Sequence, residues 1–138
     1  MSEVNDWNRQ IIEEFRANQG QVGGQFAGAP VLLLHTTGAR SGIERVNPMM
    51  YLDLDEHRYV FASKAGADSH PDWFYNLRAH PVVSVEVGEE VYDASAVVLS
   101  EPDRTRIYAV QSDRYPGFGE YQQSTSRVIP VVELVRTN

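Results

Sequence analysis

The sequence contains no cysteine, a single lysine and no long apolar run. Without cysteine the chain has no disulfide, no thiolate metal ligand and no cysteine nucleophile. Zero cysteine also agrees with the reducing cytoplasm, and the first ten residues lack the basic start and the apolar stretch of a signal peptide. A helix that spans a bilayer needs about 20 apolar residues, which the sequence does not offer. We therefore expect a cytoplasmic protein without stable insertion into a membrane.

Positive charge is also scarce, since the net formal charge of the chain is −7. Nucleic-acid binding depends on a broad positive surface, so nucleic acid is excluded as an expected partner. Apolar residues make up 42% of the chain and charged residues 22%, which is ordinary for a globular domain with a real core. The length fits one domain. We predict a single domain over residues 1–138, with an N-terminal helix in 1–20 and a barrel with its helices in 21–138.

The apolar patterning predicts three helices and about six strands. The helices are expected over residues 3–19, 70–80 and 101–115, and the strands over residues 31–38, 45–54, 58–64, 82–87, 90–100 and 128–135. Two segments rich in glycine and proline, 19–30 and 115–127, are typical of loops. Because most strands follow one another as local hairpins, we expect a mainly β, α+β fold. The expected architecture is an antiparallel barrel or sandwich with helices packed outside.

A sharp turn within residues 34–48, LHTTGARSGIERVNP, gathers unusual chemistry for an acidic protein. Glycines allow backbone N–H groups to point inward, the Ser41 hydroxyl can donate a hydrogen bond, and the guanidinium groups of Arg40 and Arg45 can bind a phosphate. The turn is therefore a candidate anion site. An exposed hairpin whose arginines are only solvated is the alternative.

The only lysine, Lys64, stands at the end of a predicted strand and is followed by Ala65 and Gly66. As a lone lysine it can be an ordinary surface residue. If its hairpin neighbours the turn, however, Lys64 converges with Arg40 and Arg45. Three cations facing one pocket would suit a phosphorylated, multiply anionic small molecule.

Aromatic residues and histidines give two further expectations. Tyr115, Phe118 and Tyr121 fall in the predicted loop over 115–127, and aromatics on such a loop favour a pocket wall or lid. The histidines show no i, i+4 pair of the kind that binds zinc on a helix. We therefore predict no metal.

Three segments together resemble the deazaflavin-dependent nitroreductase family. They are PVLLLHTTGARSGIERVNPMMYL, YVFASKAGADSHPDWFYNLRAHPVVSVEV and YPGFGEYQQSTSRVIPVVEL. The likeness runs from about residue 21 to residue 135. Members of this family use the deazaflavin coenzyme F-420, so the resemblance implies a split β-barrel related to the FMN-binding pyridoxamine phosphate oxidases.

The resemblance also implies which residues form the site. Coenzyme contacts are expected from Arg40, Ser41, Gly42, Arg45, Asn47, Pro48, Ser63, Lys64, Ala65, Gly66, Trp73 and Asn76. Contacts with the electron acceptor are expected from Met50, Tyr115, Phe118 and Tyr121. The hydroxyls of Ser63, Tyr115 and Tyr121 are the candidate proton donors. The chain departs from one branch of the family by carrying Ala39, Met50 and Phe118 where that branch has an arginine and two tyrosines.

The activity implied is hydride transfer from C5 of reduced F-420 to a quinone, an enone or a nitroaromatic compound. The coenzyme supplies the hydride, so the protein needs no nucleophile of its own. Two alternatives stay open, namely an FMN-binding oxidoreductase of the same fold and a non-catalytic protein that binds a flavin or deazaflavin. The partner is a small-molecule acceptor, and the chain is a monomer or a homodimer.

Overall fold

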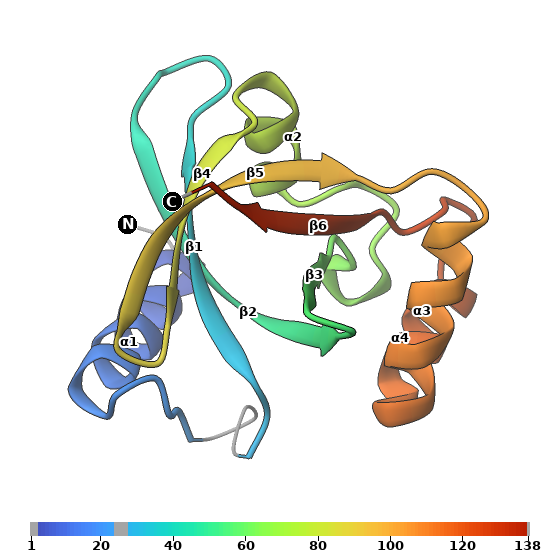
Figure 1. The fold of residues 1–138 in the computed structure, drawn as a ribbon, viewed down its shortest axis with the longest axis horizontal. Coiled ribbons are helices and arrows are strands. Elements are labelled where there is room, and N and C mark those ends of the chain that lie inside the picture. The colour runs from blue at the N-terminus through green and yellow to red at the C-terminus, as the bar shows by residue number, and fades with distance from the viewer. Residues whose placement is uncertain (1–2, 24–27, 138) are drawn as a thin grey trace.

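The computed structural model describes residues 3–23 and 28–137, with the side chains of the first helix described from residue 8 onward. Within these residues six antiparallel strands close into a barrel in the order β1-β2-β3-β6-β5-β4 (Figure 1). The strands are β1 Val31–Thr37, β2 Glu44–Leu54, β3 His57–Phe61, β4 Val82–Val87, β5 Glu90–Val98 and β6 Val131–Arg136. The predicted antiparallel barrel is confirmed.

Strand β1 lies at the centre of the packing because both of its faces are covered. Leu32 and Leu34 point into the barrel core, whereas Val31 and Leu33 pack against Phe15 of the first helix. Burial on both faces explains why this strand reads as a continuous apolar run instead of an alternating one. On its two edges β1 pairs with β2 and with β4, so its far end holds the turn into β2 in a fixed place.

Four α-helices and one short 3-10 helix lie outside the barrel among the described residues. They are α1 Glu3–Ala17, the 3-10 helix η2 Lys64–Gly66, α2 Asp72–Ala79, α3 Asp103–Arg114 and α4 Pro116–Gln123. Figure 1 shows α1 at one end of the molecule and the pair α3 and α4 at the other. The predicted helices over 3–19, 70–80 and 101–115 are confirmed with slightly shorter bounds. No helix in the described part of the chain is long and apolar enough to span a bilayer.

The loop predicted over residues 115–127 was wrong, because much of it forms α4. Pro116 starts this helix, where a missing N–H costs nothing. Phe118 is 8% exposed and packs edge-on against Phe61 of the barrel. The Tyr108 hydroxyl on α3 donates to the Phe118 carbonyl at 2.6 Å. Tertiary packing against α3 and the barrel thus stabilises a helix that its two glycines disfavour. Residues 24–27 of the other predicted loop, 19–30, lie outside the described residues.

Candidate functional site

The turn between β1 and β2 is closed by its own backbone. The Gly38 N–H donates to the Ile43 carbonyl at 2.9 Å, and the Gly42 N–H donates to the Gly38 carbonyl at 3.0 Å. Gly42 has a φ of 71°, which is left-handed and explains the glycine at this position. The Ser41 hydroxyl accepts from the Ile43 N–H at 3.2 Å. Arg40 is thereby presented at the exposed tip of a tight turn.

A buried asparagine of α2 anchors the same turn from behind. The Oδ1 of Asn76 accepts from the Ala39 N–H at 3.0 Å, and its Nδ2 donates to the Thr36 hydroxyl at 3.2 Å. The side chain is 8% exposed. Both ends of the amide are therefore used inside the protein, and they tie α2 to β1 and to the turn.

The turn, β2, α1 and α2 together line an open pocket of about 1090 Å³. Its described lining residues are Asn8, Arg9, Ile12, Gly38, Ala39, Arg40, Ser41, Glu44, Arg45, Val46, Asn47, Asp72, Tyr75 and Asn76. The structure thus brings together Arg40, Ser41, Arg45, Asn47 and Asn76 of the predicted coenzyme contacts. We call this cavity the turn pocket.

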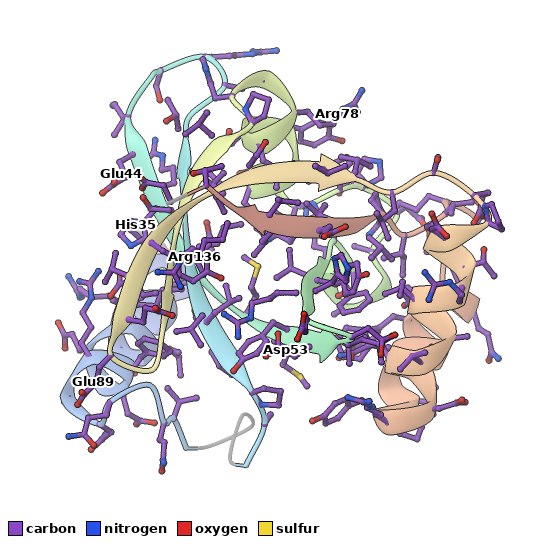
Figure 2. The ribbon with its side chains drawn as sticks, viewed as in Figure 1. His35, Glu44, Asp53, Arg78, Glu89 and Arg136 are labelled. Carbon is purple, nitrogen blue, oxygen red and sulfur yellow. The ribbon has the colours of Figure 1, made fainter. Side chains whose placement is uncertain are left out.

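Two cations of the turn pocket have no charged partner among the described residues. Arg40 and Arg45 form no hydrogen bond or ion pair with any residue that the structure describes, and both are exposed. Nearby Glu44 lies 3.4 Å from His35 Nδ1, and the two side chains are close in Figure 2. Since Glu44 has its own partner, the two guanidinium groups remain available to an anion.

Lys64 does not belong to the described lining of the turn pocket. It sits on η2, where its Nζ donates to the Ser69 hydroxyl at 3.0 Å. Ser63 precedes it, and Gly66 is packed closely on the backbone of Tyr121 in α4. The pocket therefore does not join Lys64 to Arg40 and Arg45, and a contact of all three with one ligand stays a prediction.

The other predicted contacts occupy the core or its edge. Trp73 is 8% exposed inside the barrel core. Pro48 and Met50 are half-buried on β2, and Tyr115 and Tyr121 are half-buried beside the core under α3 and α4. Their proposed contacts with coenzyme or acceptor remain predictions, as does that of the buried Phe118.

Residues of α1 were missed as part of the pocket wall. Asn8, Arg9 and Ile12 line the turn pocket, although no site residue was predicted on the N-terminal helix. They lie far from the turn in sequence, and the signal was limited to the amphipathic spacing that predicts a face against the barrel. Tyr75 of α2 was missed as well; it neighbours Asn76 in the motif and is exposed.

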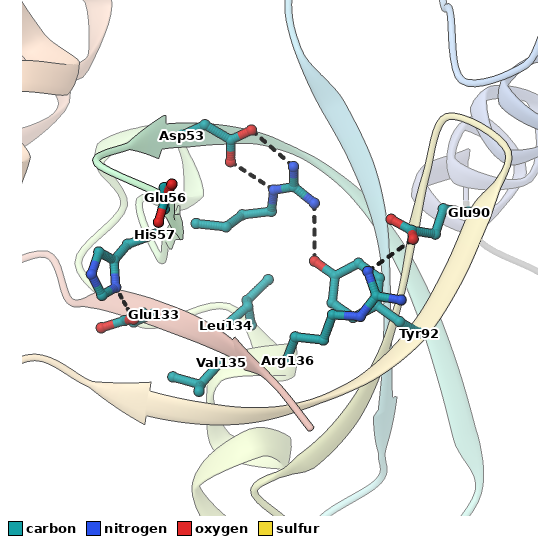
Figure 3. A pocket seen from close by; sticks show the side chains of 10 residues that line it. Asp53, Glu56, His57, Glu90, Tyr92, Glu133, Leu134, Val135 and Arg136 are labelled. Carbon is teal, nitrogen blue, oxygen red and sulfur yellow. Dashed lines mark hydrogen bonds and ion pairs between the residues drawn. The ribbon is translucent and has the colours of Figure 1, made fainter. Parts of the chain in front are cut away.

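A second cavity, of about 450 Å³, lies between the ends of β2, β3, β5 and β6 (Figure 3). Here the two arginines are already paired. Arg58 donates to both carboxylate oxygens of Asp53 at 2.7 and 2.8 Å and to the Tyr92 hydroxyl at 3.0 Å, and Arg136 lies 2.8 Å from Glu90. Because these arginines already have partners inside the protein, an anion should bind this cavity less favourably than the turn pocket.

Comparison with known proteins identifies the family of this chain and the coenzyme of that family. The sequence profile of a family described as "F420H(2)-dependent quinone reductase" matches residues 7–136. The chain belongs to this family. Membership makes it an oxidoreductase with F-420 as its coenzyme, and it confirms the resemblance to deazaflavin-dependent reductases.

Relatives cover almost the whole chain. An "F420H(2)-dependent quinone reductase" of Mycobacterium tuberculosis is 36% identical over 126 residues, which are 88% of this chain and 85% of the relative. A solved structure described as an "F420-H2 Dependent Reductase" has 38% identity and a TM-score of 0.69, and the match covers 76% of this chain and 93% of that one. A structure described as a domain-swapped dimer has 34% identity and a TM-score of 0.72, with 96% and 99% covered. The split-barrel fold is thereby confirmed.

Proposed function

We propose that the chain reduces quinones with reduced F-420 and that the turn pocket binds the anionic part of this coenzyme. One observation carries the proposal: Arg40 and Arg45 line one cavity and form no ion pair with the described residues. A phosphate or carboxylate group entering the pocket would give both guanidinium groups the charged partner that they lack. The residues present therefore fit a polyanionic coenzyme.

The chain's own residues have distinct tasks in this complex. Arg40 and Arg45 bind the phosphate and the acidic tail, and the Asn47 amide adds a hydrogen bond from β2. We assign Lys64, with the backbone around Gly66, to another part of the same coenzyme, because η2 lies outside the turn pocket. Gly42 gives the turn its left-handed backbone, and its predicted contact with the coenzyme stays part of the proposal.

Bound F-420, when reduced, supplies the hydride and its electron pair for the acceptor. The protein must orient the ring, exclude water and deliver one proton to the acceptor oxygen, which completes reduction of a quinone to a hydroquinone. The hydroxyls of Ser63, Tyr115 and Tyr121 are the proposed donors. All three residues are half-buried, and none of these hydroxyls is hydrogen-bonded to a described residue.

Quinones are the proposed principal acceptors, with enones and nitroaromatic compounds as weaker ones. The half-buried Met50 and the buried Phe118 make this part of the protein apolar, which favours flat hydrophobic acceptors over nitro groups that need hydrogen-bond donors. We further propose that residues 1–138 act as one domain, as a monomer or as a homodimer. Sedimentation of the purified protein distinguishes these two states.

A titration of F-420 with purified protein, followed by coenzyme fluorescence, tests the proposal directly. Arg45→Gln removes a proposed charge-assisted hydrogen bond to the coenzyme and should weaken binding by about 1.5–3 kcal/mol. No described residue pairs with Arg45, so the substitution breaks no ion pair inside the described protein. Arg114→Gln is the matched control, since Arg114 is exposed on α3 and does not line the pocket. Its affinity should equal that of the wild type.

Turnover is measured separately by oxidation of reduced F-420 in the presence of menadione. Rapid oxidation supports the enzyme, whereas binding without oxidation supports a passive carrier. A protein that is purified with FMN, or an Arg45→Gln variant that binds F-420 as tightly as the wild type and the Arg114→Gln control, would overturn the proposal.

A further inference from the structure

The backbone of η2 is unusual. Lys64, Ala65 and Gly66 have φ angles of 46°, 52° and 79°. All three values are in the left-handed region, which residues other than glycine rarely occupy. Two consecutive strained residues persist only where neighbouring groups hold them. The groups that hold this segment in place therefore contribute to its function.

Arg127, which follows α4, supplies most of these contacts. Its Nε donates to the Ala67 carbonyl at 2.7 Å, and its Nη2 donates to the Ser63 carbonyl at 2.7 Å. Its Nη1 donates to the Ala62 carbonyl at 3.1 Å and lies 3.1 Å from His70 Nδ1. The accepting carbonyls stand on both sides of the left-handed residues. A single planar guanidinium thus joins the two ends of the segment by hydrogen bonds.

Two neighbours complete this enclosure. A Cβ added at Gly66 would lie 2.8 Å from the Tyr121 carbonyl oxygen, so α4 leaves no room for the segment to move outward. Burial, and then the charge of Arg127, lower the pKa of His70. The ring therefore stays neutral near pH 7, and its unprotonated Nδ1 can accept from Arg127.

We propose that Arg127 is a positioning residue of the coenzyme site, which fixes residues 62–67 and thereby the direction of Lys64. This inference rests on the proposed function, where Lys64 binds part of the coenzyme. Lys64 is exposed, and its described partner is the uncharged Ser69 hydroxyl. No carboxylate therefore directs its ammonium group, and the strained backbone beneath it sets where it points. The five N–H donors of arginine lie in a fixed fork, and lysine cannot bridge the same carbonyls.

A lysine-specific protease tests the structural part without any coenzyme. Lys64 is the only lysine, so native protein is cut at one bond, between Lys64 and Ala65. Arg127→Gln should raise the rate of this cut about tenfold or more, because charged hydrogen bonds that close the segment are lost. Arg106→Gln is the control, because Arg106 is exposed on α3 and pairs weakly with Asp103 at 3.5 Å. Melting curves confirm that both variants are folded.

A double-mutant cycle on F-420 affinity tests the functional part. Arg127→Lys keeps the positive charge and should bind the coenzyme about tenfold more weakly, as should Lys64→Met. If Arg127 acts through Lys64, the double variant binds no worse than Lys64→Met alone. A merely structural loss would instead add to the effect of Lys64→Met.

The outcomes are separable. Unchanged protease cleavage in Arg127→Gln, or fully additive losses of affinity, overturn the inference about Arg127. A wild-type protein without affinity for F-420 removes the proposed function, and with it the coenzyme role of Arg127. In that case the cleavage rates still show whether Arg127 holds residues 62–67.

Discussion

Asn76 holds the turn that carries Arg40, a residue of the proposed coenzyme site. Its amide joins the Ala39 N–H of the turn to the Thr36 hydroxyl of β1, and the side chain is buried. A buried amide with both ends engaged is costly to leave half-paired. We therefore interpret Asn76 as a support of the turn that carries Arg40, and its contact with the coenzyme stays a prediction.

Replacing this amide should cost both stability and affinity. Asn76→Leu keeps the size of the side chain but leaves the Ala39 N–H without its acceptor, so we expect a loss of about 1–3 kcal/mol in the free energy of unfolding. F-420 should bind more weakly because Arg40 sits on the released turn. Urea unfolding and coenzyme titration measure the two effects.

Thr36→Val is the matched control for that experiment. It removes one hydrogen bond of Asn76 and leaves the bond to Ala39 intact, so the turn should keep its shape. We expect a smaller loss of stability, about 1 kcal/mol, and nearly normal affinity for F-420. An Asn76→Leu variant with wild-type affinity would show that the turn does not depend on this support.

At the scale of elements, α4 is a helix with weak intrinsic preference and strong packing. Gly117 lies in its first turn, with nothing within 4 Å of the position that a Cβ would occupy. Gly117→Ala should therefore raise the free energy of unfolding, by up to about 1 kcal/mol, because alanine favours the helix and restricts the unfolded chain. Thermal and urea unfolding measure this gain.

Gly66→Ala, on the facing segment η2, should have the opposite effect. The φ of Gly66 is 79°, and a Cβ there would lie 2.8 Å from the Tyr121 carbonyl oxygen. We expect a loss of more than about 1 kcal/mol, because the new methyl group forces apart η2 and α4. Equal and small effects of the two alanines would mean that α4 and η2 do not pack as described.

These elements also mark what local sequence can predict. The strands, α1, α2 and α3 follow from apolar spacing, and the sharp turn that we propose as an anion site follows from its glycines and arginines. Helix α4 does not, since glycine and proline favour a loop and the contacts that stabilise it come from distant residues. The same holds for Arg127, whose hydrogen bonds reach residues about 60 positions away. Side-chain pairing over such separations leaves no local pattern.

At the scale of the whole molecule, the turn pocket depends on how α1 is attached to the barrel. Asn8 and Ile12 of α1 form part of its wall. Arg16, at the end of the same helix, donates to both carboxylate oxygens of Glu86 on β4, at 3.2 and 2.7 Å. His35 of β1 lies 2.5 Å from the same carboxylate. Glu86 therefore connects α1 to two strands at once.

This connection should weaken in acid. The hydrogen bond from Arg16, with a further contribution from His35, holds the pKa of Glu86 below its ordinary value of 4.5. Because the unfolded chain then binds the proton more readily, Glu86 stabilises the fold above pH 4.5, and this contribution is lost as the pH falls through the lowered pKa. Glu86→Gln should accordingly make the free energy of unfolding depend less steeply on pH below 4.5. It should also lower the free energy of unfolding at pH 7.

The matched control is Glu89→Gln, since Glu89 is exposed in the neighbouring turn, as Figure 2 shows, and pairs with no described residue. Its pH profile should follow the wild type. Thermal unfolding between pH 3 and pH 7 gives the slopes, and F-420 titration at pH 7 gives the affinity. If α1 forms a wall of the coenzyme site, Glu86→Gln weakens binding although Glu86 does not line the pocket. Lower stability with unchanged affinity would mean that α1 is a cover for the barrel and no part of the binding site.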